Sequence, residues 1–347
     1  MIRRLIGPLC IASIAAVGVL TPVHAARPHA GVSLTGAGST FDLPFFTKAF
    51  EVYGAQHSVQ VNYQGIGSGA GIQQFIAKTV DFGATDVPMD PTSDLPSAVK
   101  AGGPVQQVPI ALGGVSVAYN VPGVKTGLHL SASVLGDIFL GLITKWNDGT
   151  IKKLNPKVKL PSTQIVVTHR SDGSGTSYIF TDYLSKVRDT WRGKVGVSKT
   201  PNWPVGVGAK GNDGVAGIIQ QTPGAIGYVE LAYVLQNHMK QAMLENTKHQ
   251  FLFPTLSSVA AAAASFPHVT SRNFSIVNGK GKAAYPIAGY SWVLLYKNQS
   301  DKTKGKALSA LMTWMVGAGQ TYAKKLDYVP LPKVVEQLAL SQIKAVK

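Results

Sequence analysis

The sequence predicts an α/β protein with more than one domain, and two observations support this. Short strand patterns lead directly into loops rich in glycine and serine and then into amphipathic helices, and this succession occurs three times. The chain has 347 residues, which is more than a single hydrophobic core usually spans. We therefore expect two domains, each built from strands and helices.

The first two junctions lie in the N-terminal part of the chain. Residues 32–46, VSLTGAGSTFDLPFF, run from a strand through a loop that includes Thr40 into a helix, with Pro44 in its first turn, where proline is favoured. Residues 59–78, VQVNYQGIGSGAGIQQFIAK, alternate as a strand, turn through glycines around Ser68 and enter a second helix. Both helices are thus expected to begin beside small donor groups.

The third junction adds a cation. Residues 165–167 form a β-branched strand, and residues 169–180, HRSDGSGTSYIF, place Arg170 in front of a glycine-serine loop and an amphipathic helix. A helix start offers unpaired N–H groups and partial positive charge, and a guanidinium adds a planar fork of donors for an oxyanion. If the three helix starts converge, they surround one anion. The alternative is three ordinary helix caps, with Ser174 or Thr176 bonded to its own backbone.

A dinucleotide site is a sharper alternative for the second junction. Gly65 and Gly67 open a helix, and Asp86 follows about 20 residues later, as in a nucleotide-binding fingerprint. The third small residue is Ala70, however, and this site would use only one of the three junctions. The phosphate-loop pattern G-x-x-x-x-G-K-[ST] is also absent from the sequence. We therefore expect no bound cofactor.

Six motifs resemble those of one known family. They are TGAGSTF, NYQGIGSGAG, VDFGATD, RSDGSGTS, GKGNDGVAG and PGAIGYVE, in this order, and the likeness extends from about residue 32 to LDYVPLP near the C-terminus. This arrangement resembles the periplasmic phosphate-binding protein of the ABC-type phosphate importer. The resemblance implies a two-lobed periplasmic-binding-protein fold, with a hinge and a ligand cleft between the lobes. It implies lobe I at residues 31–119 and 288–347 and lobe II at residues 120–287.

The resemblance also implies a function and a set of ligand residues. The expected function is high-affinity binding of inorganic phosphate outside the cytoplasm and its delivery to the importer's permease and ATPase complex. Asp172 matches the acid that pairs with the binding arginine, and Gly69 departs from the family pattern, in which many members have a second serine. The phosphate ligands implied by motif position are Thr40, Phe41, Ser68, Asp86, Arg170, Ser174, Gly175 and Thr176.

The N-terminus predicts export. Residues 1–25 have a basic start, an apolar stretch and a small-residue cleavage site, which together indicate a signal peptide cleaved after Ala25. We therefore expect a periplasmic protein. Cys10 lies within this signal, without the small apolar residues that usually precede a lipidated cysteine, so the mature protein is expected to lack both a lipid anchor and a disulfide.

The charge of the chain is strongly basic. Lysine and arginine total 33 against 17 acidic residues, a net charge of +16, or +14 once Arg3 and Arg4 leave with the signal. The lysines are scattered, and the sequence contains no recognisable nucleic-acid module, so we interpret them as a solvated surface. A basic exterior raises the encounter rate with anions. We expect no nucleic-acid partner and a monomeric protein.

Two other functions remain open at this point. A secreted phosphatase would need Ser174 as nucleophile with His169 as base, but DGSGT is not the G-x-S-x-G elbow, and the histidines lack metal-ligand spacing. We therefore expect no enzyme activity and no metal. A receptor for another tetrahedral oxyanion, such as sulfate or molybdate, would also suit the glycine-rich donors. Asp86 is the discriminating feature, because only a protonated anion can donate to a carboxylate.

Overall fold

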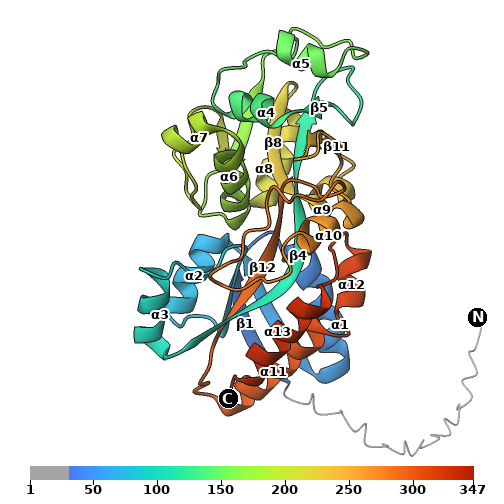
Figure 1. The fold of residues 1–347 in the computed structure, drawn as a ribbon. Coiled ribbons are helices and arrows are strands. Elements are labelled where there is room, and N and C mark those ends of the chain that lie inside the picture. The colour runs from blue at the N-terminus through green and yellow to red at the C-terminus, as the bar shows by residue number, and fades with distance from the viewer. Residues whose placement is uncertain (1–30) are drawn as a thin grey trace, which may run out of the picture. The chain divides into compact units, whose positions relative to one another are not determined.

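A computed structural model describes residues 31–347. The predicted signal peptide, its cleavage site and Cys10 lie outside the described residues. Within residues 31–347 strands and helices alternate along much of the chain, which confirms the α/β prediction (Figure 1).

The element bounds show helices following strands at all three predicted junctions. The strands are β1 (Val32–Gly38), β2 (Val59–Gly65), β3 (Phe82–Thr85), β4 (Val105–Asn120), β5 (His129–Leu130), β6 (Val166–Arg170), β7 (Val207–Ala209), β8 (Ala225–Glu230), β9 (Lys240–Gln241), β10 (Met243–Glu245), β11 (Phe251–Leu252) and β12 (Ala288–Tyr296). The helices are α1 (Leu43–His57), α2 (Ser68–Ile76), α3 (Asp94–Gly102), α4 (Ala132–Phe139), α5 (Gly149–Leu154), α6 (Gly175–Val187), α7 (Asp189–Lys194), α8 (Gly211–Gln221), α9 (Leu231–Gln236), α10 (Leu256–Ala264), α11 (Lys302–Val316), α12 (Gln320–Lys325) and α13 (Lys333–Lys344).

One long sheet has two sections that share strand β4. Its order is β2-β1-β3-β12-β4-β8-β6-β7, and β9 also pairs with β4. Residues 105–114 of β4 pair with β12, and residues 115–120 pair with β8. We call β2, β1, β3, β12 and residues 105–114 the first section, and residues 115–120, β8, β6 and β7 the second section. Figure 1 shows β4 passing from one section to the other.

Strand direction brings the functional loops together. In the first section β1, β2 and β3 are parallel, and Thr85, at the carboxyl end of β3, pairs with Trp292 of β12. In the second section β6 and β8 are parallel, and Glu230, at the carboxyl end of β8, pairs with Val115 of β4. Both sets of carboxyl ends therefore point toward the place where β4 changes partner. Loops that follow these strands meet there, as ligand loops do in open α/β sheets.

Apolar residues on both sections support this arrangement. Helix α1 buries Phe45, Phe46 and Phe50 against the first section, and the buried Tyr328 packs on Phe45 with ring centroids 5.9 Å apart. In the second section Phe180 of α6 stacks on Tyr228 of β8 at 4.3 Å. Such aromatic pairs contribute to stability beyond the area they bury. These contacts fix α1, which begins shortly after Phe41, and α6, whose first turn contains Gly175 and Thr176.

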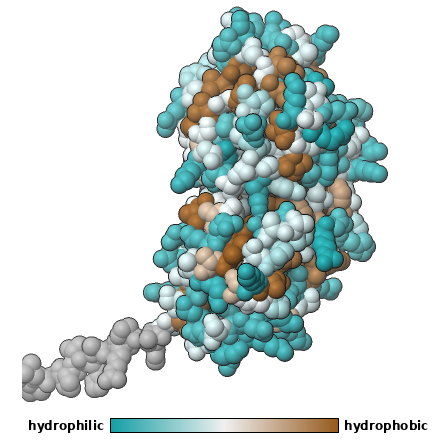
Figure 2. All heavy atoms as spheres, turned by 90° about the vertical axis from the view of Figure 1, so that its left-hand side faces the viewer, coloured by the Kyte–Doolittle hydropathy of each residue, from teal (hydrophilic) through white to brown (hydrophobic). Residues whose placement is uncertain are grey.

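The surface of the described chain is mixed in polarity. On the face drawn in Figure 2, apolar residues form separate patches among hydrophilic ones. Among residues 31–347, no helix combines the length and the apolar composition needed to cross a membrane.

Candidate anion-binding site

The first section contributes three predicted residues from its three parallel strands. Thr40 lies in the loop after β1, Ser68 is the first residue of α2 after β2, and Asp86 directly follows β3. All three are buried, with no more than 2% of each residue exposed. Because their strands are parallel neighbours, the three side chains lie at one edge of the sheet. The first two junctions therefore lie side by side in the structure.

Phe41 is held in place through its backbone. Its N–H donates to Ser39 Oγ at 2.9 Å, and its carbonyl accepts from the Tyr328 hydroxyl at 2.5 Å. The phenyl ring of Phe41 is completely buried. The backbone N–H and carbonyl of Phe41 therefore lie in the same loop as Thr40, and its side chain packs in the hydrophobic core.

The second section contributes Arg170 at the end of β6. Its Nε donates to Asp172 Oδ1 at 2.7 Å and its Nη2 donates to Asp172 Oδ2 at 2.5 Å, with both side chains less than a tenth exposed. Burial pushes the pKa of Asp172 upward, but the hydrogen bonds and charge of Arg170 outweigh it, so this pKa lies below its ordinary value. Asp172 thus forms a buried ion pair with Arg170. It fixes the orientation of the guanidinium and leaves Nη1 as the nitrogen not used by Asp172.

Helix α6 begins beside Arg170. Ser174 caps the helix, with its Oγ accepting from the N–H of Ser177 at 3.0 Å, and Gly175 and Thr176 form the first turn. Both residues are buried, although Gly175 has a backbone N–H and Thr176 a hydroxyl that need partners. The cap expected as the alternative is therefore present. The same helix start nevertheless faces the first section, so the cap and an anion site are compatible here.

Three hydrogen bonds join the segments that follow β2 and β3 to the segment around the start of α6. Ser68 Oγ accepts from the N–H of Gly175 at 3.1 Å, and Thr176 Oγ1 donates to Asp86 Oδ2 at 3.3 Å. The N–H of Gly69 donates to the carbonyl of Gly173 at 2.8 Å. At the position where the family often has a second serine, this chain thus makes its contact through the backbone. All three junctions meet in one place, which we call the anion site.

Asn212 is a member of the anion site that the sequence did not reveal. Helix α8 begins at Gly211, and Asn212 lies inside its first turn. Its Nδ2 donates to Thr40 Oγ1 at 3.0 Å and to Thr176 Oγ1 at 3.3 Å, and its Oδ1 accepts from the N–H of Glu230 at 3.0 Å. The motif GKGNDGVAG contained this residue, but only the tertiary fold shows that it bridges both sections.

Asp86 is an acceptor surrounded by donors. Its Oδ1 accepts from the hydroxyls of Ser39 and Ser291, with the Ser291 Oγ at 3.0 Å, and its Oδ2 accepts from Thr176. Burial raises the pKa of Asp86 to about 6, against the lowering effects of the Ser39 and Ser291 hydrogen bonds and of the Arg170 charge. The carboxyl group is therefore ionised near neutral pH. Ser39 and Ser291 were not among the predicted site residues.

Two further carboxyl groups are buried beside residues of the anion site, Asp42 next to Ser291 and Glu230 next to Asn212. Asp42 Oδ2 is 2.5 Å from Ser291 Oγ, and Glu230 Oε2 accepts from the N–H of Ala232 at 2.7 Å. Both residues are completely buried, and within residues 31–347 Asp42 Oδ1 and Glu230 Oε1 have no hydrogen-bond partner. Burial raises the pKa of each carboxyl well above its ordinary value.

The geometry does not form a hydrolytic pair from Ser174 and His169. His169 Nδ1 contacts the carbonyl of Arg170 at 3.0 Å, and its ring stacks on Trp203 at 4.7 Å. Ser174 Oγ instead accepts the backbone N–H of its own helix. Within the described residues, no cluster of three or more histidine, cysteine, aspartate or glutamate side chains could hold a metal ion.

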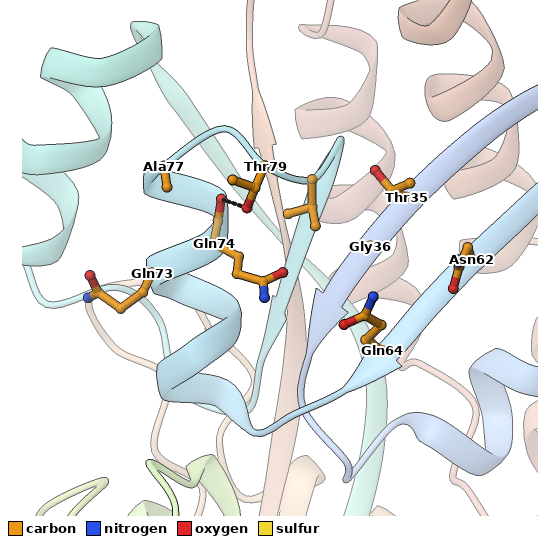
Figure 3. A pocket seen from close by; sticks show the side chains of 9 residues that line it. Thr35, Gly36, Asn62, Gln64, Gln73, Gln74, Ala77 and Thr79 are labelled. Carbon is orange, nitrogen blue, oxygen red and sulfur yellow. Dashed lines mark hydrogen bonds between the residues drawn. The ribbon is translucent and has the colours of Figure 1, made fainter.

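A separate pocket lies at the edge of the first section, away from these charged groups. It has a volume of about 470 Å³ and lies between α2 and strands β1 and β2. Figure 3 shows the side chain of Gln74 extending from α2 toward the strands, and Thr79 bonded to the carbonyl of Gln74. Its lining consists of neutral residues: Thr35, Gly36, Asn62, Gln64, Gln73, Gln74, Ala77, Thr79 and Val80. This pocket lacks the cation that an anion needs.

Comparison with known proteins places the chain in a family. A family model described as a PBP superfamily domain matches residues 25–318. A phosphate-binding protein PstS from Xylella fastidiosa is 43% identical over 92% of this chain and 88% of its own length. The chain belongs to the PstS family. Another PstS, from Haemophilus influenzae, is 42% identical over 90% of this chain and 92% of its own length. A third, from Methanocaldococcus jannaschii, is 38% identical over 89% and 85%.

Solved structures share the fold of this PstS-family chain. A high-affinity periplasmic phosphate-binding protein, solved with phosphate, aligns with a TM-score of 0.74 at 22% identity, covering 89% of this chain and 93% of that one. A phosphate-binding protein from Stenotrophomonas maltophilia aligns with a TM-score of 0.68 at 18% identity, covering 90% and 94%. The expected two-lobed periplasmic-binding-protein fold is confirmed. These PstS relatives are named as phosphate-binding proteins, so the chain belongs to a family of binding proteins and not of enzymes.

Proposed function

We propose that this protein binds inorganic phosphate at the anion site and delivers it to the permease and ATPase complex of an ABC-type importer. The observation that supports this most is Asp86, an ionised acceptor placed among hydroxyl and N–H donors, near the Arg170 guanidinium. The phosphate-binding names of its relatives support the same ligand. The proposed ligand residues are Thr40, Phe41, Ser68, Asp86, Arg170, Ser174, Gly175 and Thr176, with Asp172 in support.

The chemistry of this set suits one protonated tetrahedral anion. The Arg170 fork and the helix starts of α2 and α6 donate to oxygens that carry negative charge. Phosphate near neutral pH keeps at least one proton, which it can donate to Asp86. Sulfate has no such proton and would set its lone pairs against a buried carboxylate. The same residues thus bind phosphate and exclude sulfate.

The proposal includes movement between two lobes. We propose lobe I at residues 31–119 and 288–347 and lobe II at residues 120–287, with the proposed ligand residues divided between them. The chain returns beside β4 where the N–H of Val115 donates to the carbonyl of Ile287 at 2.8 Å. Phosphate favours closure because only the closed arrangement satisfies the donors of both lobes.

The setting follows from the predicted signal. We propose that the mature chain begins after Ala25 and acts as a free monomer in the periplasm, where it meets phosphate that has entered from outside.

One experiment tests the function directly. Phosphate and sulfate are titrated separately into the purified protein while tryptophan emission is followed. Saturable binding of phosphate alone supports the proposal, and equal response to both anions contradicts it.

A further inference from the structure

Asp42 is connected to Asp86 through a single hydroxyl group. Ser291 of β12 has its Oγ 2.5 Å from Asp42 Oδ2 and 3.0 Å from Asp86 Oδ1. All three side chains are no more than 2% exposed. The function proposed above uses Asp86 but gives no role to Asp42 or Ser291.

The number of hydrogens available limits which of these three groups can donate and which can accept. A serine hydroxyl has one hydrogen to donate, yet Ser291 lies within hydrogen-bond distance of a carboxyl oxygen from each aspartate. If both aspartates were ionised, one of these two contacts would be oxygen against oxygen with no hydrogen between them. If Asp42 carries a proton, Asp42 donates to Ser291 and Ser291 donates to Asp86. Both contacts with carboxyl oxygens then have their hydrogens. The Thr85 carbonyl, 3.2 Å from Ser291 Oγ, is the more distant acceptor to which this hydroxyl can turn when it does not donate to Asp86.

The surroundings of Asp42 favour the protonated form. The side chain is completely buried, and its Oδ1 has no partner among the described residues, which is costly for an ionised carboxylate. Burial first, and then the charge of Asp86, raises the pKa of Asp42 well above its ordinary value. The titratable groups that interact with this cluster are Asp86, Glu230, Tyr63, Tyr233 and Tyr328, with Arg170 acting on Asp86 and Tyr233.

We propose that Asp42 is a protonated carboxyl group that turns the Ser291 hydroxyl toward Asp86 and so keeps Asp86 an ionised acceptor for the ligand's proton. Asp42 is then a positioning residue for anion selectivity, and this inference rests on the proposed phosphate function. Ser39 and Ser291 both donate to Oδ1 of Asp86. The other oxygen, Oδ2, accepts from Thr176 at 3.3 Å and has a second lone pair for the ligand's proton.

Substitution of Asp42 distinguishes a proton donor from a buried negative charge. In Asp42→Ala the donor is lost, Ser291 is free to turn away and Asp86 loses part of its support. Sulfate should then compete about fivefold more strongly at pH 7, the equivalent of about one hydrogen bond. The pH below which sulfate exclusion fails should also rise. Asp42→Asn should restore both values toward wild type, because its amide N–H can donate to Ser291.

An ionised Asp42 would shift the pH at which sulfate exclusion fails in the opposite direction. If Asp42 were ionised, both Asp42→Ala and Asp42→Asn would remove a negative charge beside Asp86 and lower its pKa. The pH at which sulfate exclusion fails would then fall in both variants, and this would overturn the proposal. An unchanged pH profile in Asp42→Ala would overturn it too. Asp189→Asn is the matched control, because Asp189 has an 86% exposed side chain and pairs with Arg192 on α7.

A second variant and a ligand-free measurement complete the test. Ser291→Ala should reproduce Asp42→Ala, and the double variant should be no worse than Ser291→Ala, because both substitutions break one chain of hydrogen bonds. Infrared spectroscopy of the ligand-free protein at pH 7 should show a protonated carboxylic acid band that Asp42→Asn weakens. A wild type that does not bind phosphate refutes the proposed function. A phosphate-binding wild type whose band is unaffected by Asp42→Asn refutes the present inference alone.

Discussion

Gly175 touches Ser68 so closely that no side chain fits between them. The N–H of Gly175 donates to Ser68 Oγ at 3.1 Å, and a Cβ atom on Gly175 would lie 2.7 Å from the same oxygen and 2.5 Å from Asp86 Cβ. The first turn of α6 therefore reaches the first section only because position 175 has no side chain. This contact limits how closely the two proposed lobes can approach each other.

We expect Gly175→Ala to weaken phosphate binding by about one to two orders of magnitude. The added methyl group must push α6 away from Ser68 and Asp86, and overpacking of this kind costs about 1–3 kcal/mol. Calorimetric titration with phosphate measures the change. Gly217→Ala is the matched control, because Gly217 lies on α8 with open space around its Cβ position. Equal affinity in both variants would show that this approach does not matter for binding.

Arg170→Ala should lose several kcal/mol of phosphate binding, on the scale of about 3–5 kcal/mol for breaking a buried charged pair. The substitution removes the buried cation and leaves Asp172 to repel the anion. Arg170→Lys should recover only part of the loss, because an ammonium lacks the fork that also engages Asp172. Calorimetry at constant ionic strength gives both values. Wild-type affinity in both variants would remove Arg170 from the site.

Asp86→Asn should weaken the exclusion of sulfate more than it weakens phosphate binding. The amide can rotate to present a donor to sulfate, while its oxygen can still accept the phosphate proton. Wild-type discrimination is expected to be about 10⁴ or more, since a site that leaves a buried acceptor unpaired rejects the analogue strongly. Competition of sulfate against bound phosphate measures it in both proteins. A variant as selective as wild type would argue that Asp86 is not the discriminating residue.

The stability of the ligand-free protein should fall as the pH rises through about 6. The folded-state pKa of Asp86 is raised to about 6 from 3.8, so the folded protein holds this proton more tightly than the unfolded chain does. That contribution is complete below pH 3.8 and is lost above about pH 6, with a total of about 3 kcal/mol. Thermal unfolding of wild type and Asp86→Asn between pH 4 and about 8 tests this. The variant should lack this part of the slope, and parallel curves would contradict the assignment.

Phosphate should make the protein more compact and raise its melting temperature. A ligand that binds only the folded, closed form stabilises it by mass action, by about 2.7 kcal/mol at 100 times the dissociation constant. Small-angle scattering with and without phosphate measures compaction, and sulfate at the same concentration is the control. Binding with an unchanged radius of gyration would argue against movement of the proposed lobes.

From the sequence, the strand, loop and helix of each junction could be predicted better than the hydrogen bonds that join the junctions. Strand, loop and helix at each junction follow from hydrophobic spacing and glycine content. Thr40, Ser68 and the start of α6 lie in these junctions, and the family resemblance implies their role as ligands. Asn212, in contrast, reaches Thr40 across 172 positions of the chain, and no local pattern reports such a contact. Polar residues that bond across a sheet look like surface residues until the tertiary fold buries them.

The same limit applies to the buried carboxyl group and to the long strand. Asp42 precedes α1 in a loop where an aspartate usually caps a helix, but it makes no side-chain cap, and Ser291 of β12 is its partner instead. The change of partner within β4, between Gly114 and Val115, is equally invisible, because one apolar run serves both sections. Periodicity reports which residues are buried, but not against which strand.

The place of β12 between β3 and β4 has a consequence for biogenesis. β3 and residues 105–114 of β4 belong to the first third of the chain, yet the strand that lies between them is residues 288–296. As the polypeptide is synthesised from its N-terminus, the first section has a gap until residues 288–296 have been made. Contacts so distant in sequence form slowly. During this interval β3 and β4 each expose an unpaired edge. The newly made chain is therefore most vulnerable to aggregation and to proteases before the segment from residue 288 onward is in place.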